Sequence, residues 1–144
     1  MYERCRALVQ TVSNAQRAQR MEAISLGNLG NAYDGLGLYT QAIDCYSRSL
    51  EIDEEMGDRQ GMASSLGSLG SAYDRLGQYK EAIDYHSRSL AIEEEIGNKQ
   101  GVANSLGNLG NAYRSLGQYD EAINHHTRSL AIEETIGNLQ GVAT

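Results

Sequence analysis

A segment of 40 residues occurs three times in this chain of 144 residues, and this repeat restricts the fold more than any other feature. The copies span residues 25–64, 65–104 and 105–144, and the second and third are identical at 29 of 40 positions. A period of roughly 20 to 50 residues indicates a supersecondary unit that buries its apolar face only by stacking on neighbouring copies. The sequence therefore predicts an elongated solenoid in which each repeat contacts its neighbours.

Each copy has the pattern of two helices. In the second copy, apolar and small residues recur every three or four positions from Met62 to Leu76, and again from Tyr79 to Ile96. This spacing places them on one face of a helix. Gly77 lies between the two segments and suits a left-handed helix C-cap, so an antiparallel hairpin is expected. Because the chain contains no Pro to interrupt these helices, we predict an all-α fold with three full repeats.

Consecutive copies are joined by a glycine followed by an acid or an amide. The glycine suits the C-cap of one helix and Asp or Asn can cap the next, so first helices should begin near residues 58 and 98. The joints are Gly57-Asp58, Gly97-Asn98 and Gly137-Asn138. Three further glycines inside a first helix each cost about 1 kcal/mol relative to Ala, which close approach of a neighbouring helix would offset. They are Gly61, Gly67 and Gly70.

The two ends of the chain depart from the repeat. Residues 1–24 carry a short apolar stripe of Leu8, Val9 and Val12. They predict a degenerate helix followed by the start of the first helix of repeat one, which Ser13 or Asn14 would cap. Residues 138–144 match the opening of a first helix, so they predict a fourth one that stops before its core residues.

Charge and cysteine content exclude several classes of partner. The net charge is −7, and an acidic array is a poor binder of nucleic acid. Cys5 and Cys45 lie far apart without a CxxC or Cys/His pattern, which indicates neither a disulfide framework nor a zinc site. No apolar run has membrane-spanning length, and the N-terminus lacks a signal-peptide pattern. We expect a cytoplasmic protein without cofactor, metal, nucleic-acid or membrane partners.

A recurrent set of residues points to a known family. The set comprises a Leu-Gly pair, a Tyr, a turn of the form Gly-x-Tyr, an Ala and a further aromatic residue, and all three copies match it. In the first copy these residues are Asn28-Leu29-Gly30-Asn31-Ala32-Tyr33, Leu36-Gly37, Tyr39, Ala42-Ile43, Tyr46 and Leu50. The set resembles the tetratricopeptide repeat (TPR). The resemblance implies a right-handed superhelical solenoid whose first helices line a concave groove for a peptide or partner protein.

The repeat departs from the usual TPR pattern in length and in two residue types. Its period of 40 residues exceeds the usual period of about 34, and no Pro ends the repeat. Ser49, Ser89 and Ser129 stand where the family commonly has another small residue. Lengthened units with Gly-Asp/Asn-x-Gln-Gly joints look most like those of Pins/LGN-type scaffolds. They also look like the repeat arrays of bacterial and fungal signalling NTPases or proteases.

Differences between copies mark the surfaces where packing does not restrict the residue. In the first helices of the second and third copies they follow spacings of four, three, three and one, which is a single stripe. The stripe is flanked by the unchanged Leu66, Leu69 and Tyr73. The differing pairs are Ser64/Asn104, Ser68/Asn108, Ser71/Asn111, Asp74/Arg114 and Arg75/Ser115. In the superhelix that the resemblance implies, this open stripe is the groove.

The stripe supplies the candidate binding residues. An Asn side chain both donates and accepts hydrogen bonds, so Asn residues one helical turn apart can clamp the backbone of an extended peptide. The alternative is that they only cap or solvate the helix. Charges of both signs on the stripe imply a ligand that carries both. The predicted set is Asn28, Asn31, Asp34, Ser64, Ser68, Ser71, Asp74, Arg75, Asn104, Asn108, Asn111 and Arg114.

Other chemistries find little support. Chaperone-binding TPR domains grip a terminal carboxylate with Lys and Arg, whereas the matching positions here are Ile24, Gly27, Ser64, Gly67 and Gly107. His86 and His126 occupy the position of Tyr46, so we interpret them as aromatic substitutes and not as metal ligands or catalytic groups. The glycines lie in and after a helix and lack the Gly-Lys-Ser/Thr of a phosphate loop. The run Glu93-Glu94-Glu95 is expected on a solvated face.

We therefore predict a non-enzymatic scaffold that binds a peptide or helix of a partner in the groove. The alternative is a structural array that associates with itself end to end, with the uncapped last repeat of one chain stacked on the first helices of another. That alternative rests on an apolar surface of Leu130, Ile132 and Ile136, which normally requires a cover.

Overall fold

The computed structural model describes the backbone of residues 1–142 and the side chains of residues 1–138. This part of the chain is all-helical, as predicted. Its elements are α1 (Tyr2–Gly35), α2 (Tyr39–Met56), α3 (Arg59–Arg75), α4 (Tyr79–Ile96), α5 (Lys99–Ser115) and α6 (Tyr119–Val142).

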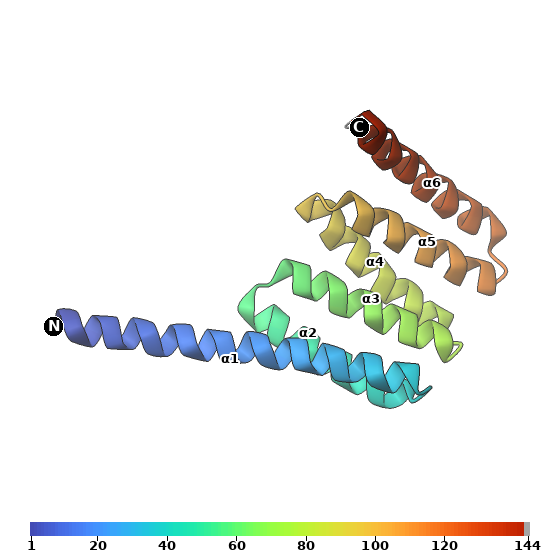
Figure 1. Ribbon diagram of the computed structural model, residues 1–144. Helices are drawn as coiled ribbons and strands as arrows, with labels where there is room; N and C mark the ends of the chain where they lie inside the picture. The colour runs from blue at the N-terminus through green and yellow to red at the C-terminus, as the bar shows by residue number, and fades with distance from the viewer. Residues whose placement is uncertain (143–144) are drawn as a thin grey trace.

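The helices form three antiparallel hairpins that stack in chain order (Figure 1). The hairpins are α1–α2, α3–α4 and α5–α6, and successive hairpins meet through α2–α3 and α4–α5. The core lies between these layers, where Leu66, Leu69, Leu106 and Leu109 are each at most 1% exposed. The predicted superhelical solenoid of three repeats is confirmed.

Glycines and caps end the helices where the repeat pattern places them. Gly77 has φ of 76°, and Gly57 and Gly97 have φ of 68° and 73°, which are left-handed values that a residue with a Cβ rarely adopts. The backbone N–H of Gly61 donates to Asp58 Oδ1 at 3.0 Å, and the N–H of Gly101 donates to Asn98 Oδ1 at 3.1 Å. These N-caps fix the starts of α3 and α5 at the first two predicted joints.

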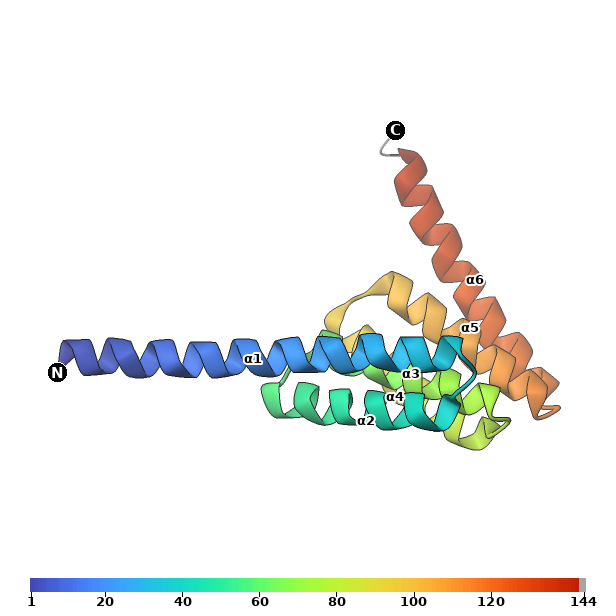
Figure 2. The same ribbon diagram turned by 60° about the horizontal axis from the view of Figure 1, so that its bottom comes forward.

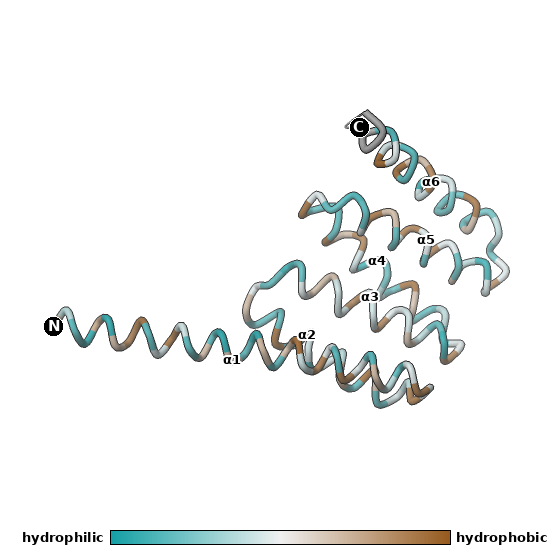
Figure 3. The backbone as a smooth tube through the Cα atoms, in the orientation of Figure 1, coloured by the Kyte–Doolittle hydropathy of each residue, from teal (hydrophilic) through white to brown (hydrophobic). Residues whose placement is uncertain are grey.

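The N-terminal segment differs from the prediction, because α1 is one continuous helix from Tyr2 to Gly35. No second helix begins at Ser13 or Asn14. The segment before Leu26 contains neither Gly nor Pro, so nothing in it ends a helix. The first half of α1 projects beyond the stack (Figures 1 and 2). Apolar and polar stretches alternate along it, and Leu8 and Val9 are 66% and 69% exposed (Figure 3).

The third joint also differs from the prediction. Residues Gly137-Asn138 form no turn, and α6 continues through them to Val142. At the first two joints a C-cap glycine ends the helix and the following helix is held by buried leucines such as Leu66 and Leu69, whereas the helical backbone of α6 is unbroken at Gly137. The predicted fourth first helix is therefore not seen in residues 138–142, and residues 143–144 lie outside the described part.

Candidate functional site

Two adjoining hollows run along the first helices α1, α3 and α5. The first hollow has a volume of 440 Å³ and lies among α1, α2 and α3. The second has a volume of 330 Å³ and continues over α3 and α4 to α5. Both are lined by Asn31, Tyr46, Ser64 and Ser68, so we treat them as one groove.

Nine of the twelve predicted binding residues line this groove. The structure therefore brings together side chains from three helices that are separated by about one repeat each. These nine residues are Asn28, Asn31, Asp34, Ser64, Ser68, Ser71, Arg75, Asn104 and Asn108. The other three line neither hollow. Asn111 and Arg114 are exposed farther along α5, and Asp74 is directed to His86.

Asn31 is positioned by a tyrosine of the second helix. The Tyr46 hydroxyl donates to Asn31 Oδ1 at 2.7 Å, so the amide NH₂ of Asn31 remains available as a donor. Burial raises the pKa of Tyr46, and the phenol therefore stays a neutral donor near pH 7. Tyr46 also lies close to Gly30, where a Cβ would come within 2.6 Å of its ring.

The charged residues of the stripe are largely engaged with one another. Arg75 on α3 forms an ion pair with Asp34 on α1, which links two neighbouring repeats. Asp74 Oδ2 lies 3.1 Å from Nε2 of His86, which is 1% exposed. From the sequence we predicted that Asp34, Asp74 and Arg75 contact a ligand. In the structure, each of them already has a partner within the chain.

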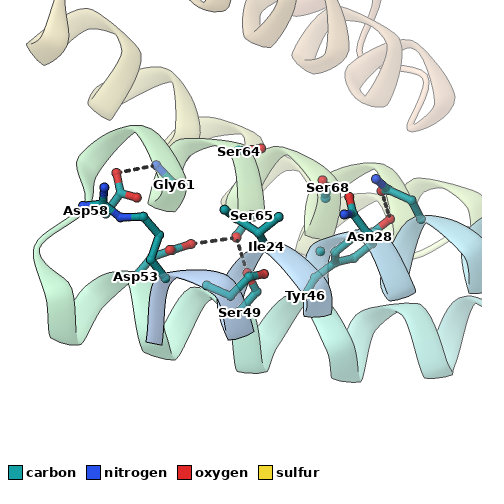
Figure 4. Close-up of a pocket in the computed structure, with 14 residues that line it drawn as sticks. Ile24, Asn28, Tyr46, Ser49, Asp53, Asp58, Gly61, Ser64, Ser65 and Ser68 are labelled. Atoms are coloured by element: carbon teal, nitrogen blue, oxygen red, sulfur yellow. Dashed lines mark hydrogen bonds between the residues drawn. The ribbon is translucent and has the colours of Figure 1, made fainter. Parts of the chain in front are cut away.

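Two buried acids of the second helices were missed. Asp53 on α2 lines the first hollow and is 5% exposed. Its Oδ2 lies 3.2 Å from the Ser65 hydroxyl, which is also 3.4 Å from the Ser49 hydroxyl (Figure 4). Burial raises the pKa of Asp53, the bond from Ser65 opposes that shift, and the nearby Asp58 carboxylate adds to it.

Glu93 on α4 is the residue equivalent to Asp53, and it lines the second hollow. It is 7% exposed, and within the described residues its Oε2 has no hydrogen-bond partner. The prediction that Glu93 is solvated is therefore wrong, although Glu94 and Glu95 are exposed. An acid recurs at positions 53, 93 and 133, but it recurs as well at the exposed positions 54, 94 and 134, so the sequence does not distinguish the buried acids.

The glycines of the first helices fall into two kinds. A Cβ on Gly61 would come within 2.7 Å of Asp53, and one on Gly70 within 2.6 Å of the His86 ring, so a neighbouring helix does approach closely through side chains. Gly67 differs, because only the Ser89 hydroxyl lies near, at 3.7 Å, and Gly27 has nothing within 4 Å. Gly27 and Gly67 line the hollows, as Gly61 does, but unlike Gly61 they leave open space beside the helix.

A family model described as the tetratricopeptide repeat matches residues 20–95 and 61–135. This chain belongs to the TPR family. TPR proteins are generally non-enzymatic, and their fold is a scaffold for protein interactions. No curated protein is significantly similar in sequence.

Several solved structures share this fold. The TPR domain of Arabidopsis FLU has a TM-score of 0.78 and 26% identity, over 81% of this chain and 98% of that one. The second TPR of Spaghetti (RPAP3), bound to the HSP90 peptide SRMEEVD, has a TM-score of 0.67 and 24% identity, over 83% and 98%. Aspartyl phosphate phosphatase F from Bacillus subtilis has a TM-score of 0.79 and 21% identity, over 83% and 31%. The last two likenesses concern the fold alone.

Within residues 1–142, no helix combines the length and the apolar character that crossing a bilayer requires. Among the described side chains, no group of three His, Cys, Asp or Glu residues is arranged to hold a metal ion.

Proposed function

We propose that this TPR chain is a non-enzymatic scaffold that binds an extended peptide of a partner protein in the groove along α1, α3 and α5. The observation that carries the proposal is the convergence of nine amide, hydroxyl and charged residues from three repeats on two adjoining hollows. The RPAP3 repeat with its HSP90 peptide supports it as an example of a related fold that holds a peptide. The 40-residue variant is the form that resembles Pins/LGN-type scaffolds.

An extended backbone suits the chemistry of the groove. Asn28, Asn104 and Asn108 each present both a donor and an acceptor, which matches the alternating N–H and C=O groups of a peptide. Gly27 and Gly67 provide floor positions without side chains, where a peptide backbone can approach the helix. With a net charge of −7, the chain is better suited to protein than to nucleic acid, and we place it in the cytoplasm.

Substitution of the two groove-lining glycines, Gly27 and Gly67, provides a test that separates an effect on peptide binding from an effect on stability. A random peptide library displayed on phage is selected against the wild-type protein, and the enriched peptides are synthesised and their affinities measured by fluorescence anisotropy. Gly67→Ala and Gly27→Ala should weaken these peptides about tenfold or more, because each added methyl group occupies the floor. Both variants should unfold at the same or a higher denaturant concentration, because Ala favours a helix by about 1 kcal/mol over Gly.

Gly35→Ala is the matched control. Gly35 is the last residue of α1, has open space around it and lines neither hollow. The Gly35→Ala variant should bind the selected peptides as the wild type does. Equal affinity of the wild type and both floor variants, or a failure to select any peptide, would refute groove binding.

A second candidate function is self-association through α6. Leu130 is 55% exposed and Ile123 65% exposed, whereas Leu50, the first-repeat equivalent of Leu130, is 8% exposed. Light scattering across a concentration series should then show a dimer that Leu130→Lys disrupts. Leu76→Lys is the control, because Leu76 is 39% exposed in the middle repeat, away from both ends of the stack. A monomer at every concentration would reject this candidate.

A further inference from the structure

The second hollow contains a carboxylate without a partner. Glu93 is 7% exposed, and its Oε2 is buried beside Gly101 without a hydrogen-bond partner in the described residues. A buried carboxylate normally requires a hydrogen bond or an opposite charge, since an uncompensated charge is costly to remove from water. The free protein therefore lacks a group that Glu93 would bind favourably.

The first hollow repeats this arrangement. Asp53 occupies the equivalent position on α2, is 5% exposed, and has the Ser65 hydroxyl as its donor at 3.2 Å. In the third repeat the equivalent Glu133 is exposed. The acids at this repeat position are thus buried in the first two repeats, whose second helices line the hollows, and exposed in the third.

Neighbouring cations do not neutralise Glu93. Arg75 is the basic residue that lines the same hollow, and its guanidinium is paired with Asp34. In the first hollow, Arg20 is the basic residue that lines the same space as Asp53 and Asp58. Each hollow therefore carries one more acid than base, in a chain whose net charge is −7. Such a surface attracts a cation, and partial burial strengthens the attraction.

We infer that the groove selects peptides with basic residues, and that Glu93 receives the guanidinium or ammonium group of one Arg or Lys side chain. Asp53 receives a second basic side chain in the first hollow. This inference rests on the proposed peptide-binding function and names the chemistry of its ligand. A carboxylate can accept two parallel hydrogen bonds from a guanidinium, so Arg is the better fit.

The peptides selected against the wild type provide the probe. They should contain Arg or Lys more often than the starting library. Replacing the critical Arg of a selected peptide with citrulline, which has the same shape but no charge, should weaken binding to the wild type about tenfold. The same replacement should have little effect on binding to Glu93→Gln, because the charge partner is already absent. Added salt should weaken the Arg peptide more than the citrulline peptide.

Glu133→Gln is the matched control, because it is the same substitution at the same repeat position in the exposed copy. It should bind both peptides as the wild type does. Glutamine has the size of glutamate, and unfolding of each variant monitored by circular dichroism verifies that it is folded. Selected peptides without basic residues, or an equal loss on citrulline replacement in the wild type and Glu93→Gln, would overturn the inference while leaving groove binding intact. Failure to select any peptide would refute the proposed function itself.

Discussion

The two sides of α3 are under different constraints. Leu66 and Leu69 face the neighbouring helices and are each 1% exposed, and the third repeat has Leu at both equivalent positions. On the groove side, Ser64 is exposed and Ser68 is half-buried, and both are replaced by Asn at the equivalent positions of α5. Because the side that packs must fill a fixed volume, it tolerates no change, whereas the groove side can vary.

The glycines on the same helix show this difference more directly. Gly70 faces the ring of His86, and the equivalent Gly30 faces the ring of Tyr46. Gly67 faces the hollow and touches almost nothing. A helical glycine on the packed side thus makes room for an aromatic ring, whereas Gly67 on the other side leaves open space in the groove.

The largest expected effect comes from removing a leucine on the packed side. Leu69→Ala should lower the free energy of unfolding by about 2–5 kcal/mol, because it removes a fully buried side chain and leaves a cavity. Leu29→Ala is the control, since Leu29 holds the same place in the first repeat but is 45% exposed. Urea denaturation should show a clearly smaller loss for Leu29→Ala. Equal losses would mean that burial does not distinguish the two positions.

The next effect comes from filling the space at Gly70. An added Cβ would lie 2.6 Å from His86, so overpacking of about 1–3 kcal/mol should outweigh the helix propensity gain of about 1 kcal/mol. Gly70→Ala should therefore destabilise the fold, in contrast to Gly67→Ala. In a His86→Ala background the clash is absent, and Gly70→Ala should become neutral or stabilising. The same loss in both backgrounds would show that the His86 ring is not the cause.

Asp53 lies at the boundary between the two sides, and its effect should depend on pH. Its pKa is raised in the folded state, above an unfolded value of about 3.9, so the folded protein holds more protons between the two values. The contribution of Asp53 to stability should therefore fall as the pH rises from about 4 through the folded pKa. Relative to Asp53→Asn, the wild type should become less stable over that range. Asp44→Asn, at an exposed position on α2, should show no such divergence.

The helices and most of the groove could be predicted because their determinants are local and occur three times. Leucine spacing and joint glycines define α3, α4 and α5, and the residues that differ between copies mark the groove side. The ends could not be predicted, because Ile96-Gly97-Asn98 forms a turn and Ile136-Gly137-Asn138 remains helical. The same local sequence takes two conformations, and what differs is whether a following helix packs on it.

The missed acids have a related explanation. Glu93 resembles Glu94 and Glu95 in sequence, and its burial depends on the approach of α5 at Gly101. Likewise, Tyr46 and Asp53 belong to a second helix. They line the groove because this part of α2 borders the hollow between α1 and α3. Residues that reach the groove from a second helix cannot be recognised from the stripe of differing residues, because that stripe was read from the first helices alone.

The smallest expected effect is at the rim of the groove. Arg75 is 49% exposed and Asp34 is 18% exposed, so the guanidinium side of their ion pair meets solvent. Exposed pairs contribute about 0–1 kcal/mol, so Arg75→Gln should lower the free energy of unfolding by less than about 1 kcal/mol, and by less still at high salt. Urea denaturation at low and high salt would measure both values. A loss as large as that of Leu69→Ala would end the distinction between the two sides of α3, because a groove residue would then hold the repeats together as strongly as the core does.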